Sequence, residues 1–161
     1  MSVKLKNLII SIIPVLVTGA ICSYFSRTGV KEWFGALTQN MFMPPNYVFS
    51  IAWSIIYILL TVSFYRILKS PAQNKTYAIR IYWQQLILQI LWCGLFFGAQ
   101  MPLIGGLIIL WLDMTVLRMI CAFFKIDKTA AFLNIFYLCY ICFATFLNWS
   151  FLYHLDLIKT F

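Results

Sequence analysis

The sequence predicts an all-α integral membrane protein, built as a bundle of five transmembrane helices with a long ordered loop between the first and second helix. Hydrophobic residues make up 63% of the 161 residues and charged residues only 10%, whereas a soluble domain is typically about 25% charged. The charges fall between five apolar stretches, each with about the 20 residues needed to cross a hydrocarbon core about 30 Å thick. The expected spans are residues 7–26, 47–68, 80–98, 103–124 and 129–153.

The first span follows two lysines, Lys4 and Lys6, and its apolar run continues to Phe25. A cleaved signal peptide is the alternative, but the run has no small-x-small cleavage site before a polar mature start. We therefore expect a retained helix. The spans are so closely spaced that no separate soluble domain fits, and residues 1–161 are expected to form a single transmembrane domain.

The first loop, residues 27–46, is too polar to cross the membrane, yet it contains Trp33, Phe34 and the pair Pro44-Pro45. Long loops in compact proteins are usually functional lids or disordered. The aromatic residues and the proline pair favour an ordered lid over the outer mouth of the bundle.

The third span carries the sharpest pattern. Gln85, Gln89, Trp92 and Phe96 are spaced by four, three and four residues, which places them on one helix face. Two amides in hydrocarbon are costly unless they find partners. This face suits a cavity for a flat, partly polar ligand, or else interhelical hydrogen bonds worth about 0.6–2 kcal/mol each. The two interpretations are compatible, and both stay open.

Two other spans place aromatic residues at membrane depth. Trp53 and Tyr57 lie one helical turn apart in the second span. The last span groups four residues near one another on one face: Tyr137, Tyr140, Ala144 and Asn148. Ala144 leaves room for a neighbour or ligand to approach closely, and Asn148 adds a third amide at depth.

The fourth span follows a very short connection, residues 100–102, so the third and fourth helices should form an antiparallel hairpin. Gly105 and Gly106 indicate close helix packing. Asp113 lies in the middle of the span and requires an interior partner or protonation. A buried hydrogen bond between helices is the favoured interpretation, and a proton relay is the alternative.

Basic residues predict the orientation. Nine of the 12 Lys and Arg residues lie on the side of the N-terminus, namely Lys4, Lys6, Arg66, Lys69, Lys75, Arg80, Arg118, Lys125 and Lys128. By the positive-inside rule the N-terminus is cytoplasmic and the C-terminus lies outside. Topology and anionic lipid headgroups account for the net charge of +8, so we expect no nucleic acid partner. A bacterial plasma membrane fits best.

Catalytic and metal-binding patterns are missing from the sequence. Cys139 and Cys142 have the spacing of a redox or metal motif, but on an apolar helix without clustered histidines they are expected to be small packing residues. We find no Ser/His/Asp set and no glycine-rich phosphate loop. The sequence therefore predicts no metal and no cofactor.

An ordered set of motifs across the spans carries a family resemblance: Trp33-Phe34, Leu37, Phe42, Pro44-Pro45, Trp53 and Tyr57, then Gln89-x-x-Trp92 and Leu95-Phe96-Phe97-Gly98, then Tyr137-Leu138, Phe143-Ala144-Thr145 and Leu147-Asn148. This pattern resembles the translocator protein or tryptophan-rich sensory protein family (TspO/MBR), also known as the peripheral benzodiazepine receptor family. The resemblance covers nearly the whole chain.

The resemblance implies a five-helix bundle, usually a homodimer, with a cavity that opens near the first loop. It implies a hydrophobic ligand, such as a porphyrin or other tetrapyrrole, a sterol or a benzodiazepine-like compound, bound for transport or sensing. Together, the residue patterns and the resemblance predict these ligand-binding residues: Trp33, Phe34, Pro45, Trp53, Tyr57, Gln85, Gln89, Trp92, Phe96, Tyr140, Ala144, Leu147 and Asn148.

Two alternatives accompany that function. One is a light-dependent porphyrin-degrading enzyme acting through Trp53, and the other is a proton-coupled transporter of small molecules using Asp113. Tyr140 stands where the family has the tryptophan implicated in porphyrin breakdown, which weakens the enzymatic alternative. The loop also has Gln39-Asn40 where the family has Lys-Pro, and Phe136 replaces a family proline.

Overall fold

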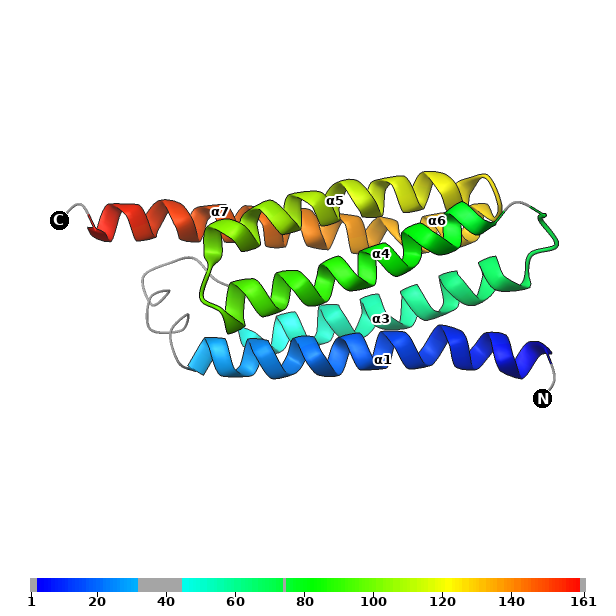
Figure 1. Cartoon of the computed structure of the whole chain (residues 1–161), viewed down its shortest axis with the longest axis horizontal. Coiled ribbons are helices and arrows are strands. Elements are labelled where there is room, and N and C mark those ends of the chain that lie inside the picture. The colour runs from blue at the N-terminus through cyan, green and yellow to red at the C-terminus, as the bar shows by residue number, and fades with distance from the viewer. Residues whose placement is uncertain (1–2, 32–44, 74, 160–161) are drawn as a thin grey trace.

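The computed structural model describes residues 3–31, 45–73 and 75–159, and within these ranges it is an elongated bundle of helices (Figure 1). The helices are α1 (Val3–Gly29), α3 (Asn46–Lys69), α4 (Thr76–Cys93), the π-helix η2 (Gly94–Gly98), α5 (Pro102–Phe124), α6 (Lys128–Leu133) and α7 (Ile135–Lys159). Five helical segments are long and apolar enough to cross a membrane. The five predicted spans are therefore present in the fold.

The helices run roughly antiparallel along one axis (Figure 1). α1 packs beside α3, α4 beside α5, and α5 beside α7. The N-terminus shares one end of the bundle with the α3–α4 and α5–α6 connections, and the C-terminus lies at the other end. We call these the N-terminal end and the C-terminal end of the bundle.

The outer surface of the bundle is strongly apolar. Large hydrophobic side chains stay exposed on every long helix, among them Leu16, Ile58, Ile87, Trp111 and Phe146. A soluble monomer rarely exposes apolar patches of this extent, whereas lipid tails solvate them well. The chain is therefore an integral membrane protein by its surface as well as by its helix lengths.

Two of the five spans contain a local irregularity of the helix. The third span ends in η2, where the Ala99 N–H donates to the Gly94 carbonyl five residues earlier, at 2.7 Å. Such π turns are often found at functional sites. The short connection that follows is made possible by Gln100, whose φ of 56° turns the chain before Pro102 begins α5.

The last span was expected to be continuous, but a turn at Asn134 separates α6 from α7. The Asn134 amide donates to the Ala130 carbonyl at 2.7 Å and to the Ser63 hydroxyl of α3 at 2.6 Å. A side-chain amide that bonds to the local backbone competes with the regular helical pattern. The break is therefore coupled to the packing of α6 against α3.

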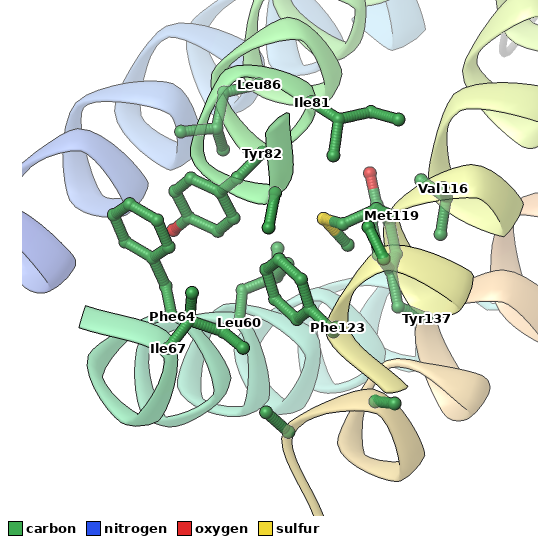
Figure 2. Packing of buried hydrophobic residues seen from close by; sticks show 14 of the residues in the cluster. Leu60, Phe64, Ile67, Ile81, Tyr82, Leu86, Val116, Met119, Phe123 and Tyr137 are labelled. Carbon is green, nitrogen blue, oxygen red and sulfur yellow. The ribbon is translucent and has the colours of Figure 1, made fainter. Parts of the chain in front are cut away.

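The half of the bundle nearer the N-terminal end has a tightly packed aromatic core (Figure 2). The Phe64 ring of α3 stacks on the Tyr82 ring of α4, with centroids 3.6 Å apart and planes within 5° of parallel. We call the following fully buried side chains the scaffold cluster: Leu60, Phe64, Ile67, Tyr82, Met119 and Phe123. These side chains join α3, α4 and α5.

Two glycines let α5 approach its neighbours in the half nearer the C-terminal end. A Cβ at Gly105 would lie 3.0 Å from the Cβ of Phe96, and one at Gly106 would lie 3.2 Å from the amide nitrogen of Asn148. Both distances are tighter than ordinary packing allows. The glycines thus bring Phe96 and Asn148 close to α5, as the close-packing signal in the sequence predicted.

Candidate functional site

Most of the predicted ligand-binding residues meet in the half of the bundle nearer the C-terminal end. We call the following side chains the aromatic–amide cluster: Trp53, Tyr57, Gln89, Trp92, Tyr140 and Asn148. They come from α3, α4 and α7. Trp33 and Phe34, also predicted to bind the ligand, lie outside the described residues, and Pro45 is exposed immediately before α3.

Trp53 is the central ring of the cluster. Its centroid lies 5.7 Å from that of Tyr57 on the same helix and 5.6 Å from that of Tyr140 on α7, where the rings meet edge to face. Trp53 packs against both buried cores of the bundle, and it is itself only partly buried, as are Tyr57 and Tyr140. The three rings therefore offer faces that a flat molecule could share.

The two glutamines of α4 are fully buried and each bonds to a tyrosine. Gln89 donates through Nε2 to the Tyr57 hydroxyl at 3.0 Å, and Gln85 accepts at Oε1 from the Tyr137 hydroxyl at 2.9 Å. Among the described residues, the other polar atom of each amide, Gln89 Oε1 and Gln85 Nε2, has no partner. Each amide therefore has hydrogen-bonding capacity left for a ligand or a water molecule.

Trp92 and Asn148 form a second polar contact. The Trp92 indole N–H donates to Asn148 Oδ1 at 3.3 Å, and Asn148 Nδ2 donates to the Pro102 carbonyl at 3.0 Å. This chain of bonds joins α4, α7 and the beginning of α5. Because both groups of the Asn148 amide are occupied, Asn148 positions Trp92, and it is a weaker candidate than Gln89 for binding a ligand directly.

The remaining predicted residues surround Trp92 with apolar atoms. Phe96 lies with its ring centroid 6.1 Å from that of Trp92 and 5.8 Å from that of Phe151. Ala144 and Leu147 of α7 are buried, and Ala144 belongs to the same core. Phe96 and Ala144 therefore form part of the wall behind Trp92.

The helix α1 also contributes to the aromatic–amide cluster. A Cβ at Gly19 would lie 2.8 Å from the Tyr57 ring, so glycine is what allows α1 to press on that ring. Cys22, one turn further along α1, is buried and donates weakly to the Gln89 carbonyl, with sulfur and oxygen 3.7 Å apart. The sequence alone does not identify the ring that Gly19 approaches, because that ring lies on another helix.

Comparison with known proteins matches residues 10–154 to the TspO/MBR family. The chain belongs to this family. It is 33% identical over 147 residues to the tryptophan-rich protein TspO of Archaeoglobus fulgidus, covering 91% of this chain and 95% of that protein. It is 28% identical over 156 residues to the tryptophan-rich protein TspO of Chlorobaculum tepidum, covering 94% of this chain and 98% of that protein.

A third TspO/MBR relative is the protein CrtK of Rhodobacter capsulatus, 28% identical over 135 residues, with 80% of this chain and 84% of that protein covered. A relative in Cereibacter sphaeroides is called a tryptophan-rich sensory protein. These names fit a sensing or regulatory role for members of the family.

Asp113 of α5 has the interior partner that its depth requires, since the Thr145 hydroxyl of α7 donates to Asp113 Oδ2 at 2.8 Å. Its other oxygen, Oδ1, has no partner among the described residues. Asp113 therefore forms the hydrogen bond between helices that its place in the sequence predicted.

Two hollows are lined by residues outside the aromatic–amide cluster of this TspO/MBR chain. One, of about 600 Å³, opens at the C-terminal end between Pro102, Trp149 and Tyr153. The other, of about 460 Å³, lies toward the N-terminal end between α4 and α5. The rings of the cluster contact one another directly, so the side chains themselves fill the space between them.

Cys139 and Cys142 correct a further expectation. Both are exposed on the surface of α7 and both are free thiols. They face outward and take no part in the packing between helices that was predicted for them.

Proposed function

We propose that this protein binds a planar hydrophobic ligand, a tetrapyrrole such as a porphyrin, at the aromatic–amide cluster and serves in its transport or sensing. The observation that carries the proposal is the pairing of partly exposed rings with a buried, half-satisfied amide at membrane depth. Trp53 and Tyr140 supply the rings, and Gln89 supplies the amide.

The rings account for the shape of the ligand. Trp53, Tyr57 and Tyr140 present aromatic rings from two helices, and the Trp53 centroid lies within 6 Å of each tyrosine centroid. Aromatic pairs contribute about 0.5–1.5 kcal/mol beyond the area they bury, and a macrocycle inserted between two of these rings would replace one such pair by two. A flat, wide ligand is favoured over a compact one.

The polar atoms account for the chemistry of the ligand. Gln89 Oε1 and the Tyr140 hydroxyl are buried without a partner among the described residues. A carbonyl oxygen accepts hydrogen bonds and a hydroxyl can do either, so a ligand with N–H groups or carboxyl groups would find partners here. The pyrrole nitrogens and side-chain carboxylates of a tetrapyrrole meet this requirement.

Entry of the ligand requires the rings to separate. Trp53 and Tyr140 are in edge contact across α3 and α7, two helices that touch only sparsely. Parting these helices opens the cluster without disturbing the scaffold cluster.

We also propose an orientation, a membrane and an oligomeric state for the protein. The excess of basic residues at the N-terminal end favours a cytoplasmic N-terminus and an external C-terminus, in a bacterial plasma membrane. The family resemblance favours a homodimer, and the exposed apolar surface of the helices offers room for the second copy.

The test is a titration with protoporphyrin IX of the protein in nanodiscs, followed in the dark by quenching of tryptophan fluorescence. Saturable quenching is expected, and Trp53→Ala should weaken the affinity by about tenfold or more, because stacking surface is lost. Trp111→Ala is the matched control, since Trp111 is also a tryptophan but is exposed on the outer face of α5.

Three results would decide the matter. Unsaturable quenching of the wild-type protein, or unchanged affinity in a correctly folded Trp53→Ala, would refute the proposed site. Porphyrin loss on illumination, beyond that of free porphyrin and abolished by Trp53→Phe, would establish the light-dependent enzyme instead. Ligand flux into proteoliposomes that is abolished by Asp113→Asn would favour the proton-coupled transporter.

A further inference from the structure

The hollow of about 460 Å³ toward the N-terminal end has a composition unlike that of the rest of the surface. It lies between the first turn of α4 and the last two turns of α5. Two cations, Arg118 and Lys125, line it together with apolar and small side chains. Neither the aromatic–amide cluster nor the proposed tetrapyrrole site includes any of these residues.

The two cations have no competing anion. Arg118 and Lys125 are both exposed, and among the described residues neither forms an ion pair or a side-chain hydrogen bond. The acidic residue nearest to Lys125 in the sequence, Asp127, is held by Arg66 at 2.9 Å and also caps α6. The one nearest to Arg118, Asp113, is buried and accepts from the Thr145 hydroxyl. The hollow therefore carries a local positive charge that nothing in the described fold neutralises.

The two cations lie at different depths along α5. Arg118 and Lys125 are seven residues apart on α5, which is two turns on one face, or about 10 Å along the axis. Lys125 lies at the helix end and Arg118 lies deeper. The pair thus spans the zone from the lipid headgroup to the beginning of the hydrocarbon.

The floor of the hollow is apolar and is kept open by small residues. Ala78 of α4 and Ala122 of α5 are buried at the contact between the two helices, and Leu117 and Cys121 line the outward side. Larger side chains at either alanine would fill the space. An acyl chain is the apolar group that a bilayer supplies at this position.

We propose that this hollow binds one anionic phospholipid of the leaflet at the N-terminal end, with the phosphate between Arg118 and Lys125 and an acyl chain along Leu117 and Cys121. Basic pockets between transmembrane helices on the cytoplasmic side characteristically hold anionic headgroups. The first turn of α4, which has no side-chain cap, adds backbone N–H donors on the same side. A zwitterionic lipid offers the phosphate but adds a cation next to the two of the protein.

The proposal is tested by native mass spectrometry of the full chain in detergent, titrated with phosphatidylglycerol or with phosphatidylcholine of the same chain length. The wild-type protein should retain one phosphatidylglycerol about tenfold more tightly than phosphatidylcholine. The double variant Arg118→Gln, Lys125→Gln should lose most of this preference. Lys4→Gln, Lys6→Gln removes the same charge from α1 at the same end, and it should keep the preference.

A second variant tests the cavity without changing charge. Cys121→Trp places a bulky side chain at an exposed position of the lining and should weaken phosphatidylglycerol binding at least threefold. If the double variant does not fold, Lys125→Gln alone, at an exposed helix end, carries the charge test with a loss of about threefold.

Three outcomes would overturn the proposal. Equal losses in the α1 variant and the α5 variant would show general charge attraction. Full binding in Cys121→Trp would show that no cavity is used. Displacement of the lipid by millimolar inorganic phosphate would identify a site for soluble anions in its place.

Discussion

The two halves of the bundle use aromatic residues in opposite ways. In the scaffold cluster, Phe64 and Tyr82 stack with centroids 3.6 Å apart and are both fully buried. In the aromatic–amide cluster, Trp53 meets Tyr140 edge to face at 5.6 Å, and both rings remain partly exposed. The first arrangement fixes three helices against one another, whereas the second leaves ring faces available.

Both halves also contain buried polar groups. Near the scaffold cluster, the Ser63 hydroxyl donates to the Ala130 carbonyl of α6 and accepts from Asn134 Nδ2, whereas Asn134 Oδ1 and the Tyr82 hydroxyl have no partner among the described residues. At the aromatic–amide cluster, Gln89 Nε2 donates to the Tyr57 hydroxyl, and Gln89 Oε1 has no partner among the described residues. Spare hydrogen-bonding capacity therefore occurs in both halves, and at the aromatic–amide cluster it lies beside rings that are partly exposed.

The largest expected effect tests the scaffold half. Phe64→Ala removes a fully buried ring from a close stack, and we expect the free energy of unfolding to fall by about 3 kcal/mol. Thermal or denaturant unfolding in detergent micelles measures this. Phe146→Ala is the control, because Phe146 is exposed on α7 and should change stability by about 0.5 kcal/mol or less. A similar loss in both variants would contradict the division into two halves.

The second prediction tests the binding half. Gln89→Leu keeps the size of the side chain but removes the amide, so we expect tetrapyrrole affinity to fall about tenfold while stability changes by about 1 kcal/mol or less. The protoporphyrin titration and the unfolding assay together measure the two quantities.

Gln84→Leu supplies the matched control for that prediction. Gln84 is a partly buried amide on the same helix that lies outside the aromatic–amide cluster. Its replacement should leave affinity unchanged. Equal weakening by both variants would mean that Gln89 acts through the general polarity of α4 and does not contact the ligand.

The sequence predicted the five spans because hydropathy and span length decide them locally. It also placed Gln85, Gln89, Trp92 and Phe96 together, because helical periodicity decides which residues share a face. The lid expected over the outer mouth, with Trp33 and Phe34, lies outside the described residues.

Features that depend on partners far along the chain were not predictable. The break at Asn134 requires Ser63, 71 residues away in the sequence. The close approach of Gly19 to the Tyr57 ring requires α1 and α3 to be side by side. Whether Gln89 keeps a free acceptor depends on which tyrosine reaches it, and periodicity alone contains no such information.

The smallest expected effect lies at the N-terminal end, where Arg66 pairs with Asp127 at 2.9 Å and Asp127 accepts from the Ala130 N–H at the start of α6. Burial on its own raises the pKa of Asp127. The Ala130 N–H and the Arg66 guanidinium lower that pKa by more than burial raises it, so the net pKa lies below the ordinary value. A carboxylate with a lowered pKa stabilises the fold above its unfolded-state pKa of about 4, and this stabilisation is lost as the pH falls through the lowered value.

Asp127→Asn keeps a capping oxygen but removes the charge, and because the Arg66 side chain of the pair is exposed we expect it to cost about 0.5 kcal/mol at pH 7. Unfolding of the two proteins in micelles at pH 7 and at pH 3 measures the difference, which should shrink toward zero in acid and at high salt. A difference in the free energy of unfolding that is the same at both pH values would assign the effect to the cap geometry. It would also show that the ion pair does not contribute to stability. Tetrapyrrole affinity should not change in this variant, since the pair lies at the opposite end of the bundle from Trp53 and Gln89 and belongs to the half that holds the helices in place.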